Sequence, residues 1–218
     1  MSQNEATTTR LPDSPVSIYE RFTRLYDLMF RFNGYARSIE NYLRENPLPL
    51  ATGARVLDAG CGTGLLTLAL LRVLRRPAKI TAVDLSGRSL QTARRAVRKL
   101  GADPRHKISF VRANALSLPF PADSFDLVVT SGVLEYLPLR EGLAELSRVL
   151  APGGYLFFLP VRPSPASRLL EIMFRFKAHP PRAVAENTER FFRVLEHYQF
   201  PTLDPIGWTK SVVLAKKL

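Results

Sequence analysis

The chain has 218 residues, 46% of them hydrophobic, and its 31 Lys and Arg against 19 Asp and Glu give a formal net charge of +12. This length and apolar content predict one globular domain with a sizeable core and exclude a disordered chain. The single cysteine, Cys61, excludes an intramolecular disulfide and a cysteine-based zinc site. No apolar run is long enough to span a bilayer, and the polar N-terminus lacks a signal core. We therefore expect a cytoplasmic protein, either free or peripheral at the inner face of the membrane.

The first part of the chain divides into a polar lead and an amphipathic segment. Residues 1–15 are polar, contain two prolines and are predicted to be disordered. Apolar residues then recur at the three- and four-residue spacings of one helix face: Ile18, Phe22, Leu25, Met29 and Phe32. Asn33-Gly34 is expected to split this segment into two helices, and Asn46-Pro47 to end it.

Beyond residue 54, apolar runs of strand length alternate with helical patterns. The predicted strands are Arg55–Asp58, Lys79–Asp84, Ile108–Arg112, Phe125–Thr130 and Tyr155–Leu159. Helices are expected from Leu65, over Ser89–Leu100 and over Leu139–Leu150. This alternation predicts right-handed βαβ units and a doubly wound, Rossmann-like parallel sheet with helices on both faces.

The C-terminal part is expected to close this α/β domain. Glu189–Tyr198 is interpreted as a last surface helix. Leu203–Trp208 and Ser211–Lys216 then form a hairpin, so that the sheet has seven strands and is mostly parallel with an antiparallel C-terminal strand. Residues 16–218 are predicted to be a single domain.

The most informative segment is a glycine-rich loop between the first strand and the next helix, Val56-Leu-Asp-Ala-Gly-Cys-Gly-Thr-Gly64. Glycines allow the backbone to turn sharply and to approach a ligand closely. The free N–H groups of the following helix face the same place. A strand, glycine-rich loop and helix in this order indicate a site for a nucleotide-like cofactor.

A nicotinamide cofactor is one alternative for this loop. Its fingerprint is Gly-x-Gly-x-x-Gly followed about twenty residues later by an acidic residue. Asp84 meets the acidic requirement, but Leu65 stands where the third glycine belongs. An NAD-dependent oxidoreductase therefore remains a remote alternative.

Four ordered blocks carry a resemblance to a known family. They are the glycine-rich loop, Val83-Asp-Leu-Ser86, Pro119-Phe-Pro-Ala-Asp-Ser-Phe-Asp-Leu-Val-Val129 and Leu146-Ser-Arg-Val-Leu-Ala-Pro-Gly-Gly154. Together they resemble the class I S-adenosylmethionine-dependent methyltransferases. Within this family the chain is most similar to the group of ubiquinone and menaquinone biosynthesis C-methyltransferases. The resemblance implies S-adenosylmethionine as methyl donor and a small or lipophilic acceptor that is quinone-, phospholipid- or metabolite-like.

The resemblance also implies roles for individual residues. The loop glycines would lie against the amino-acid part of the donor, with Asp58 orienting its ammonium, and Asp84 would accept both ribose hydroxyls. Leu85 would cover the adenine, and Asn114 stands where the family usually has an aspartate that accepts the adenine amino group. The full predicted cofactor set is Tyr26, Asp58, Gly60, Cys61, Gly62, Gly64, Asp84, Leu85, Asn114, Ala115 and Ser131. No metal ligand is predicted.

The acceptor side carries weaker signals. Glu135 and Tyr136 are the candidate catalytic residues, Glu135 either as a base or as a carboxylate that hydrogen-bonds the cofactor or a loop. Relatives imply a lid made of the N-terminal helical segment 16–46 and the insert 160–182. The Asn/Asp-Pro-Pro-Tyr motif typical of enzymes that methylate adenine or glutamine amides is missing after Thr130.

The positive charge leaves two further readings open. Large apolar residues among Arg168 and Arg175 suit an anionic membrane surface, or they pack on the domain. The excess of Lys and Arg is densest between Arg72 and Arg112, so a methyltransferase or non-catalytic relative acting on RNA through its basic surface is the main alternative. The sequence does not determine the oligomeric state.

Overall fold

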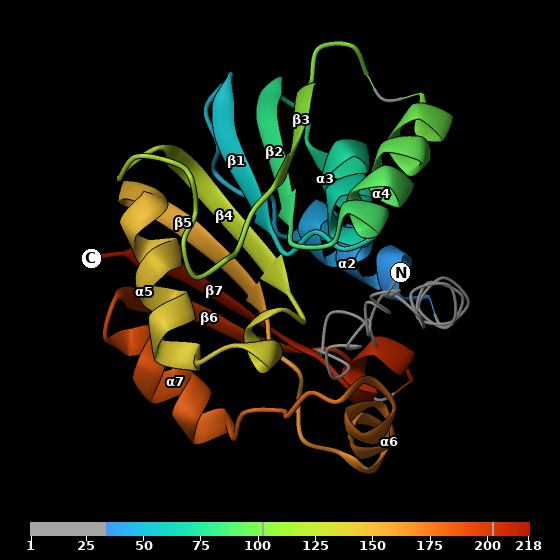
Figure 1. Ribbon diagram of the computed structural model, residues 1–218, viewed down its shortest axis with the longest axis vertical. Coiled ribbons are helices and arrows are strands. Elements are labelled where there is room, and N and C mark those ends of the chain that lie inside the picture. Colours follow the sequence, from blue (N-terminus) through green and yellow to red (C-terminus); the bar gives the residue numbers. More distant parts are fainter. Residues whose placement is uncertain (1–33, 102, 202) are drawn as a thin grey trace, which may run out of the picture.

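A computed structural model describes residues 34–101, 103–201 and 203–218 and contains one seven-stranded sheet in the order β3-β2-β1-β4-β5-β7-β6 (Figure 1). The strands are β1 (Ala54–Ala59), β2 (Ala78–Asp84), β3 (Lys107–Arg112), β4 (Phe125–Ser131), β5 (Leu150–Leu159), β6 (Phe192–Gln199) and β7 (Ser211–Lys217). β7 is antiparallel to both of its neighbours, whereas β1 to β5 pair in parallel. The predicted doubly wound, Rossmann-like sheet is confirmed.

Helices cover both faces of this sheet (Figure 1). The helices are α2 (Tyr35–Glu45), α3 (Leu65–Val73), α4 (Gly87–Leu100), α5 (Leu139–Val149), α6 (Pro165–Phe174) and α7 (Pro181–Glu189), with the short 3₁₀ helices η1 (Leu134–Tyr136) and η2 (Pro205–Trp208). Successive strand residues point to opposite faces, so Val56 joins the core under α2 and α3 while Leu57 joins the core under α5 and α7. Central strands buried on both faces explain the continuous apolar runs of the sequence.

The topology gathers the carboxyl ends of the parallel strands at one edge of the sheet. Asp84, Ser131 and Leu159 are the last residues of β2, β4 and β5. β1 and β4 are paired neighbours in the middle of the sheet, and the strand order reverses between them. In open α/β sheets a ligand binds beyond the strand ends at such a reversal.

Two predictions for the C-terminal part are wrong. Glu189–Tyr198 is not a surface helix, because α7 ends at Glu189 and β6 follows from Phe192. Burial alternates residue by residue along β6, and β7 pairs with its whole length, so tertiary pairing overrides the helical tendency of this segment. Leu203–Trp208 is not a hairpin strand either. Pro205 opens the 3₁₀ helix η2, and β7 pairs with β5 and β6 instead.

The N-terminal predictions are only partly accessible. The predicted lead 1–15, the first helix of the segment 16–46 and Tyr26 lie outside the described residues. The second helix is α2, which begins directly after Gly34 at a φ of 76° and packs on α3. The predicted division of the segment near Asn33-Gly34 agrees with this start.

Candidate functional site

The loop between β1 and α3 has the conformation that its glycines permit. Gly60, Gly62 and Gly64 all have positive φ values, of 72°, 53° and 91°. A Cβ atom on Gly60 would lie 2.5 Å from Cβ of Val133, so a side chain cannot be added there without moving the backbone of the segment after β4. Cys61 is buried beside Ala82 and Leu90, and burial raises the pKa of its thiol well above the usual value. It fills space and is not set up as a nucleophile.

Asp58 lies beneath this loop and is 1% exposed. The Thr67 hydroxyl donates a hydrogen bond to Oδ2 of Asp58, while Oδ1 has no partner among the described residues. Burial raises the pKa of Asp58 to about 7, and the charge of Asp84 adds to the rise. Asp58 lines a small cavity together with Gly60, Gly62 and Ser131. A cationic group placed in that cavity would give Oδ1 the partner it lacks.

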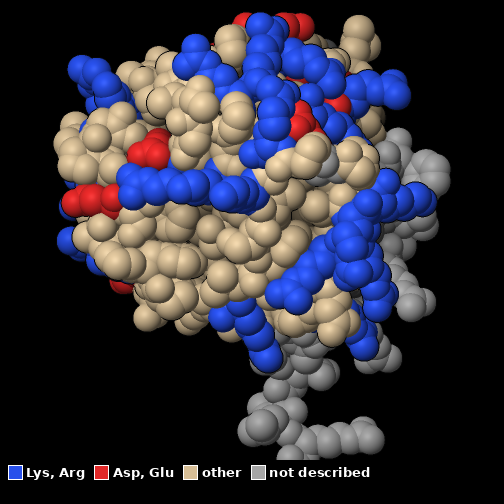
Figure 2. All heavy atoms as spheres, turned by 90° about the horizontal axis from the view of Figure 1, so that it is seen from above, with Lys and Arg blue, Asp and Glu red and all other residues tan. Residues whose placement is uncertain are grey.

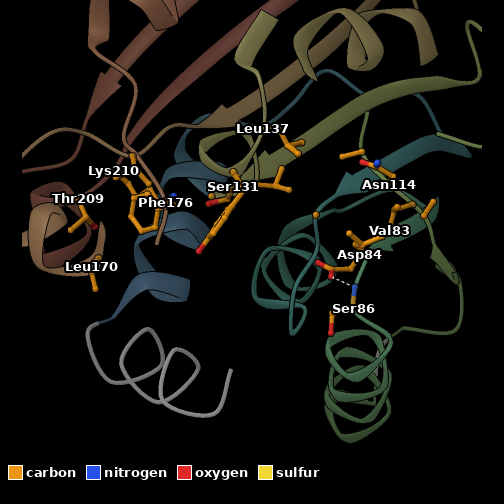
Figure 3. Close-up of a pocket in the computed structure, with 18 residues that line it drawn as sticks. Val83, Asp84, Ser86, Asn114, Ser131, Leu137, Leu170, Phe176, Thr209 and Lys210 are labelled. Atoms are coloured by element: carbon orange, nitrogen blue, oxygen red, sulfur yellow. Dashed lines mark hydrogen bonds between the residues drawn. The ribbon is translucent and has the colours of Figure 1, made fainter. Parts of the chain in front are cut away.

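Asp84, at the end of β2, connects the glycine-rich loop to the loop that follows β2. Its Oδ2 accepts the Gly62 N–H at 2.8 Å, and its Oδ1 accepts the Ser86 N–H at 2.8 Å, the bond drawn in Figure 3. A carboxylate has about four acceptor positions, so it can accept further donors from a ligand in the adjoining pocket. The two bonds fix the direction of the carboxylate before a ligand arrives.

A long pocket extends from Asp84 along the strand ends (Figure 3). One end is lined by Val83, Asp84, Leu85, Ser86, Ala113, Asn114 and Ala115; Gly60, Ser131, Gly132 and Val133 form the middle; and Tyr136, Leu137, Val161, Leu170, Phe176, Thr209 and Lys210 form the other end. We call the end at Asp84 the cofactor end and the end at Lys210 the acceptor end. The pocket shares Gly60 and Ser131 with the small cavity at Asp58, so the two spaces adjoin.

The residues predicted for the adenosine part of the donor lie together at the cofactor end. Leu85 is 44% exposed and presents an apolar surface to the pocket. Asn114 uses its side-chain oxygen to accept the Leu116 N–H at 3.0 Å, which closes a local turn. One lone pair of this oxygen stays available for a ligand. Ser131 sits between the two spaces, hydrogen-bonded to the hydroxyl of Tyr35 on α2.

The structure separates the two candidate catalytic residues. Tyr136 lines the pocket, its ring centre 5.7 Å from that of Phe176, and burial raises the pKa of its hydroxyl. Glu135 is buried but is not among the lining residues. Its Oε1 accepts the Val161 N–H at 2.5 Å, and its Oε2 has no partner among the described residues. Glu135 thus holds the segment after β5 in place through this hydrogen bond. Of the two roles predicted for Glu135, this contact matches a carboxylate that hydrogen-bonds a loop.

Sequence reasoning missed most of the acceptor end. Thr209 and Lys210 reach the pocket because an isolated bridge pairs Lys210 with Val161, joining the start of β7 to the end of β5. Neither residue belongs to a motif. The signals that the sequence offers for this end are Tyr136 and the predicted insert 160–182, which contains Val161, Leu170 and Phe176. Within residues 34–101, 103–201 and 203–218 there is no group of His, Cys, Asp and Glu that could hold a metal ion.

Comparison with known proteins agrees with this geometry. Residues 57–158 match a family described as "Methyltransferase domain". Demethylmenaquinone methyltransferase from Thermus thermophilus is 36% identical over 143 residues, which are 64% of this chain and 62% of the relative. Ubiquinone/menaquinone biosynthesis C-methyltransferase from Psychromonas ingrahamii is 37% identical over 108 residues, 49% of this chain and 42% of the relative. The matched segments thus span about half the length of these curated relatives.

A solved structure extends the likeness to the whole fold. Geranyl diphosphate C-methyltransferase from Streptomyces coelicolor A3(2), in complex with Mg²⁺, geranyl diphosphate and S-adenosyl-L-homocysteine, superimposes with a TM-score of 0.67 at 17% identity, over 97% of this chain and 90% of that one. Residues 57–158 thus match a methyltransferase domain, and the glycine-rich loop and the sheet order agree with that match.

Proposed function

We propose that this protein transfers the methyl group of S-adenosylmethionine to a small, lipophilic acceptor that enters the acceptor end of the pocket. The observation that carries the proposal is the division of one pocket into a carboxylate-bearing end and a largely apolar end. Relatives named for ubiquinone and menaquinone biosynthesis, and the geranyl diphosphate enzyme, support an acceptor with apolar character.

The cofactor end fits the donor group by group. S-adenosylmethionine carries an ammonium and a vicinal ribose diol, so two carboxylates are suitable partners for it. Oδ1 of Asp58 would accept from the ammonium, and Asp84 from the vicinal ribose hydroxyls. Leu85 would cover one face of the adenine while Asn114 and Ala115 meet its edge.

The acceptor end supplies alignment and exclusion of water. When bound, the donor provides a methyl group activated by its positive sulfur. The space beside this methyl group is surrounded by apolar side chains, those of Leu137, Val161, Leu170 and Phe176. Holding a lipophilic acceptor there in line with the methyl group lowers the entropic part of the barrier, and a dry site strengthens the attraction between opposite charges. Glu135 acts as a positioning residue for Val161 in this proposal.

Helix α6 supports delivery of the acceptor from an anionic membrane surface. Its inner side contributes Leu170 to the pocket, so the predicted insert 160–182 serves as a lid. Its outer side exposes Leu169 and Ile172, which are 60% and 79% exposed, next to the exposed Arg168 and Arg175. Apolar side chains flanked by arginines suit peripheral binding to anionic lipid. None of the helices in the described parts of the chain has the length and apolar character needed to cross a bilayer.

The dense basic surface does not favour RNA as the acceptor. Figure 2, seen from above the view of Figure 1, shows Lys and Arg outnumbering Asp and Glu on that face. Exposed Arg75 and Arg76 precede β2, and exposed Arg105 and Lys107 lie where β3 begins. These are the amino ends of parallel strands whose carboxyl ends carry the pocket. A nucleic acid bound there would not reach the acceptor end.

The decisive experiment follows a labelled methyl group from S-adenosylmethionine into a bacterial extract divided into lipid, aqueous and nucleic-acid fractions. We expect label in the lipid fraction with the unaltered protein and none above background with Asp84→Ala. Losing two charge-assisted bonds to the donor should weaken its binding about 100-fold. Asp126→Ala, which removes an exposed partner of Arg55 at the opposite edge, is the matched control. Label confined to the aqueous or nucleic-acid fraction would contradict the lipophilic acceptor.

A further inference from the structure

A buried lysine lies at the acceptor end of the pocket. Lys210 is 2% exposed and lines the pocket on the same side as Thr209 and Phe176 (Figure 3). Its backbone is held by the bridge to Val161 and by its own N–H, which donates to the Ile206 carbonyl at 2.8 Å. The side chain of Lys210 therefore extends from a fixed backbone position at the carboxyl edge of the sheet.

The charge of Lys210 is poorly compensated by the described part of the protein. Its Nζ donates one hydrogen bond, to the Leu159 carbonyl at 3.3 Å, although an ammonium has three donors. No described carboxylate forms an ion pair with it within 4.0 Å. Burial lowers the pKa of Lys210, and the negative charge of Glu135 only partly opposes this. A buried cation without a partner is costly, so the site favours either a neutral amine or an anion brought by a ligand.

The surroundings restrict what that ligand can be. The ring of Tyr136 and the ring of Phe176 border the same end of the pocket, which suits a flat, unsaturated group. Besides Lys210, the titratable groups that line the pocket are Asp84, at the far end, and Tyr136, whose raised pKa keeps it neutral. Among the described residues that line the acceptor end, the amine of Lys210 is thus the one basic group.

We propose that Lys210 binds the acidic hydroxyl of a phenol- or enol-type acceptor and holds it as an oxyanion. The inference rests on the proposed methyltransferase function and deepens it by naming the acceptor class. The hydroxyl proton passes to the neutral amine: the O–H bond breaks, an N–H bond forms, and the products are an oxyanion and an ammonium in contact. The pair gains attraction in a dry site, and the oxyanion raises the electron density of its own oxygen and of the adjacent ring carbon, the two atoms able to accept a methyl group.

The test uses 4-nitrophenol as the probe, because its anion absorbs visible light and its neutral form does not. The absorbance of the bound probe is followed against pH in the presence of saturating S-adenosylhomocysteine. We expect the apparent pKa of the bound phenol to fall by at least about one unit, a tenfold shift toward the anion, relative to the phenol in water. Lys210→Met should abolish this shift, whereas Lys79→Met, at an exposed lysine of β2, should leave it intact.

Two further readouts separate this role from a structural one. Methionine has the volume of lysine without its charge, so Lys210→Met should retain its melting temperature and its affinity for S-adenosylhomocysteine. An unchanged phenol shift in Lys210→Met, or no binding of the probe to the unaltered protein, would overturn the proposal. Binding of S-adenosylhomocysteine is measured separately by calorimetry, and the phenol titration is repeated without it. Failure of S-adenosylhomocysteine to bind would contradict the proposed function, whereas loss of the phenol shift alone would contradict the role of Lys210.

Discussion

The two ends of the pocket differ in whether their residues come from neighbouring or from distant segments of the sequence. The cofactor end and the adjoining cavity at Asp58 are lined by the glycine-rich loop, the end of β2 and the residues directly after β2 and β3, so each contact belongs to a short local motif. The acceptor end combines η1, the end of β5, α6 and the start of β7, which meet only in the folded protein. One end thus offers a ligand fixed backbone geometry, while the other end can change its specificity through side chains on separate segments.

Gly60→Ala should have the largest effect, because the added methyl group has no room where the glycine-rich loop meets the segment after β4, in the middle of the pocket. The added Cβ would lie 2.5 Å from Cβ of Val133, and the residue would keep a φ of 72°. We expect no measurable binding of S-adenosylhomocysteine by calorimetry and a loss of roughly 2–4 kcal/mol in the free energy of unfolding.

Gly87→Ala is the matched control for that substitution. Gly87 is the first residue of α4, and a Cβ there would meet nothing within 4 Å. We expect unchanged binding and an unchanged or slightly higher melting temperature. Equal losses in both alanine variants would mean that the crowding at Val133 does not govern the loop.

Asp58→Asn should have an intermediate effect with opposite signs for stability and binding. The pKa of Asp58 is about 7 in the folded protein and near 4 in an unfolded chain, so the folded state binds the extra proton between these values. Stability without a ligand therefore falls as the pH rises from about 4 to about 7. The asparagine variant removes this loss and should be more stable above pH 7, by at most about 4 kcal/mol.

Binding of the donor product should show the reverse dependence. The ammonium of S-adenosylhomocysteine needs the ionised carboxylate, so its affinity for the unaltered protein should rise as the pH passes from about 5.5 to 8. In Asp58→Asn the affinity should be about tenfold weaker and nearly constant with pH. Calorimetry at several pH values, paired with urea unfolding, measures both quantities. A parallel pH dependence in the two proteins would show that another group titrates.

The same division explains what the sequence could predict. The positions of Asp84 and Gly60 at the carboxyl edge of the sheet could be predicted because strand, loop and helix are neighbours in the chain, and their geometry follows from local backbone rules. β6 was mistaken for a helix because its pairing with β7 is nonlocal. Glu135 and Tyr136 are adjacent in sequence, yet only the fold determines that Tyr136 lines the pocket and Glu135 binds the Val161 backbone. Lys210 carries no local signal, since its environment comes from the bridge that pairs it with Val161, between the segments that follow β5 and precede β7.

The smallest effect on the cofactor end should come from the outer side of α6, where the two ends can be separated experimentally. The double variant Leu169→Asp, Ile172→Asp changes two exposed side chains that do not line the pocket. Affinity for S-adenosylhomocysteine and the melting temperature should therefore stay unchanged. Binding to phosphatidylglycerol vesicles should weaken at least about fivefold, because apolar surface no longer enters the lipid interface and two negative charges oppose it. Leu195→Asp, at an exposed apolar position of β6, is the control. Equal vesicle binding by all three proteins would leave α6 as a lid that delivers no lipid, and the acceptor end would then take its ligand from solution.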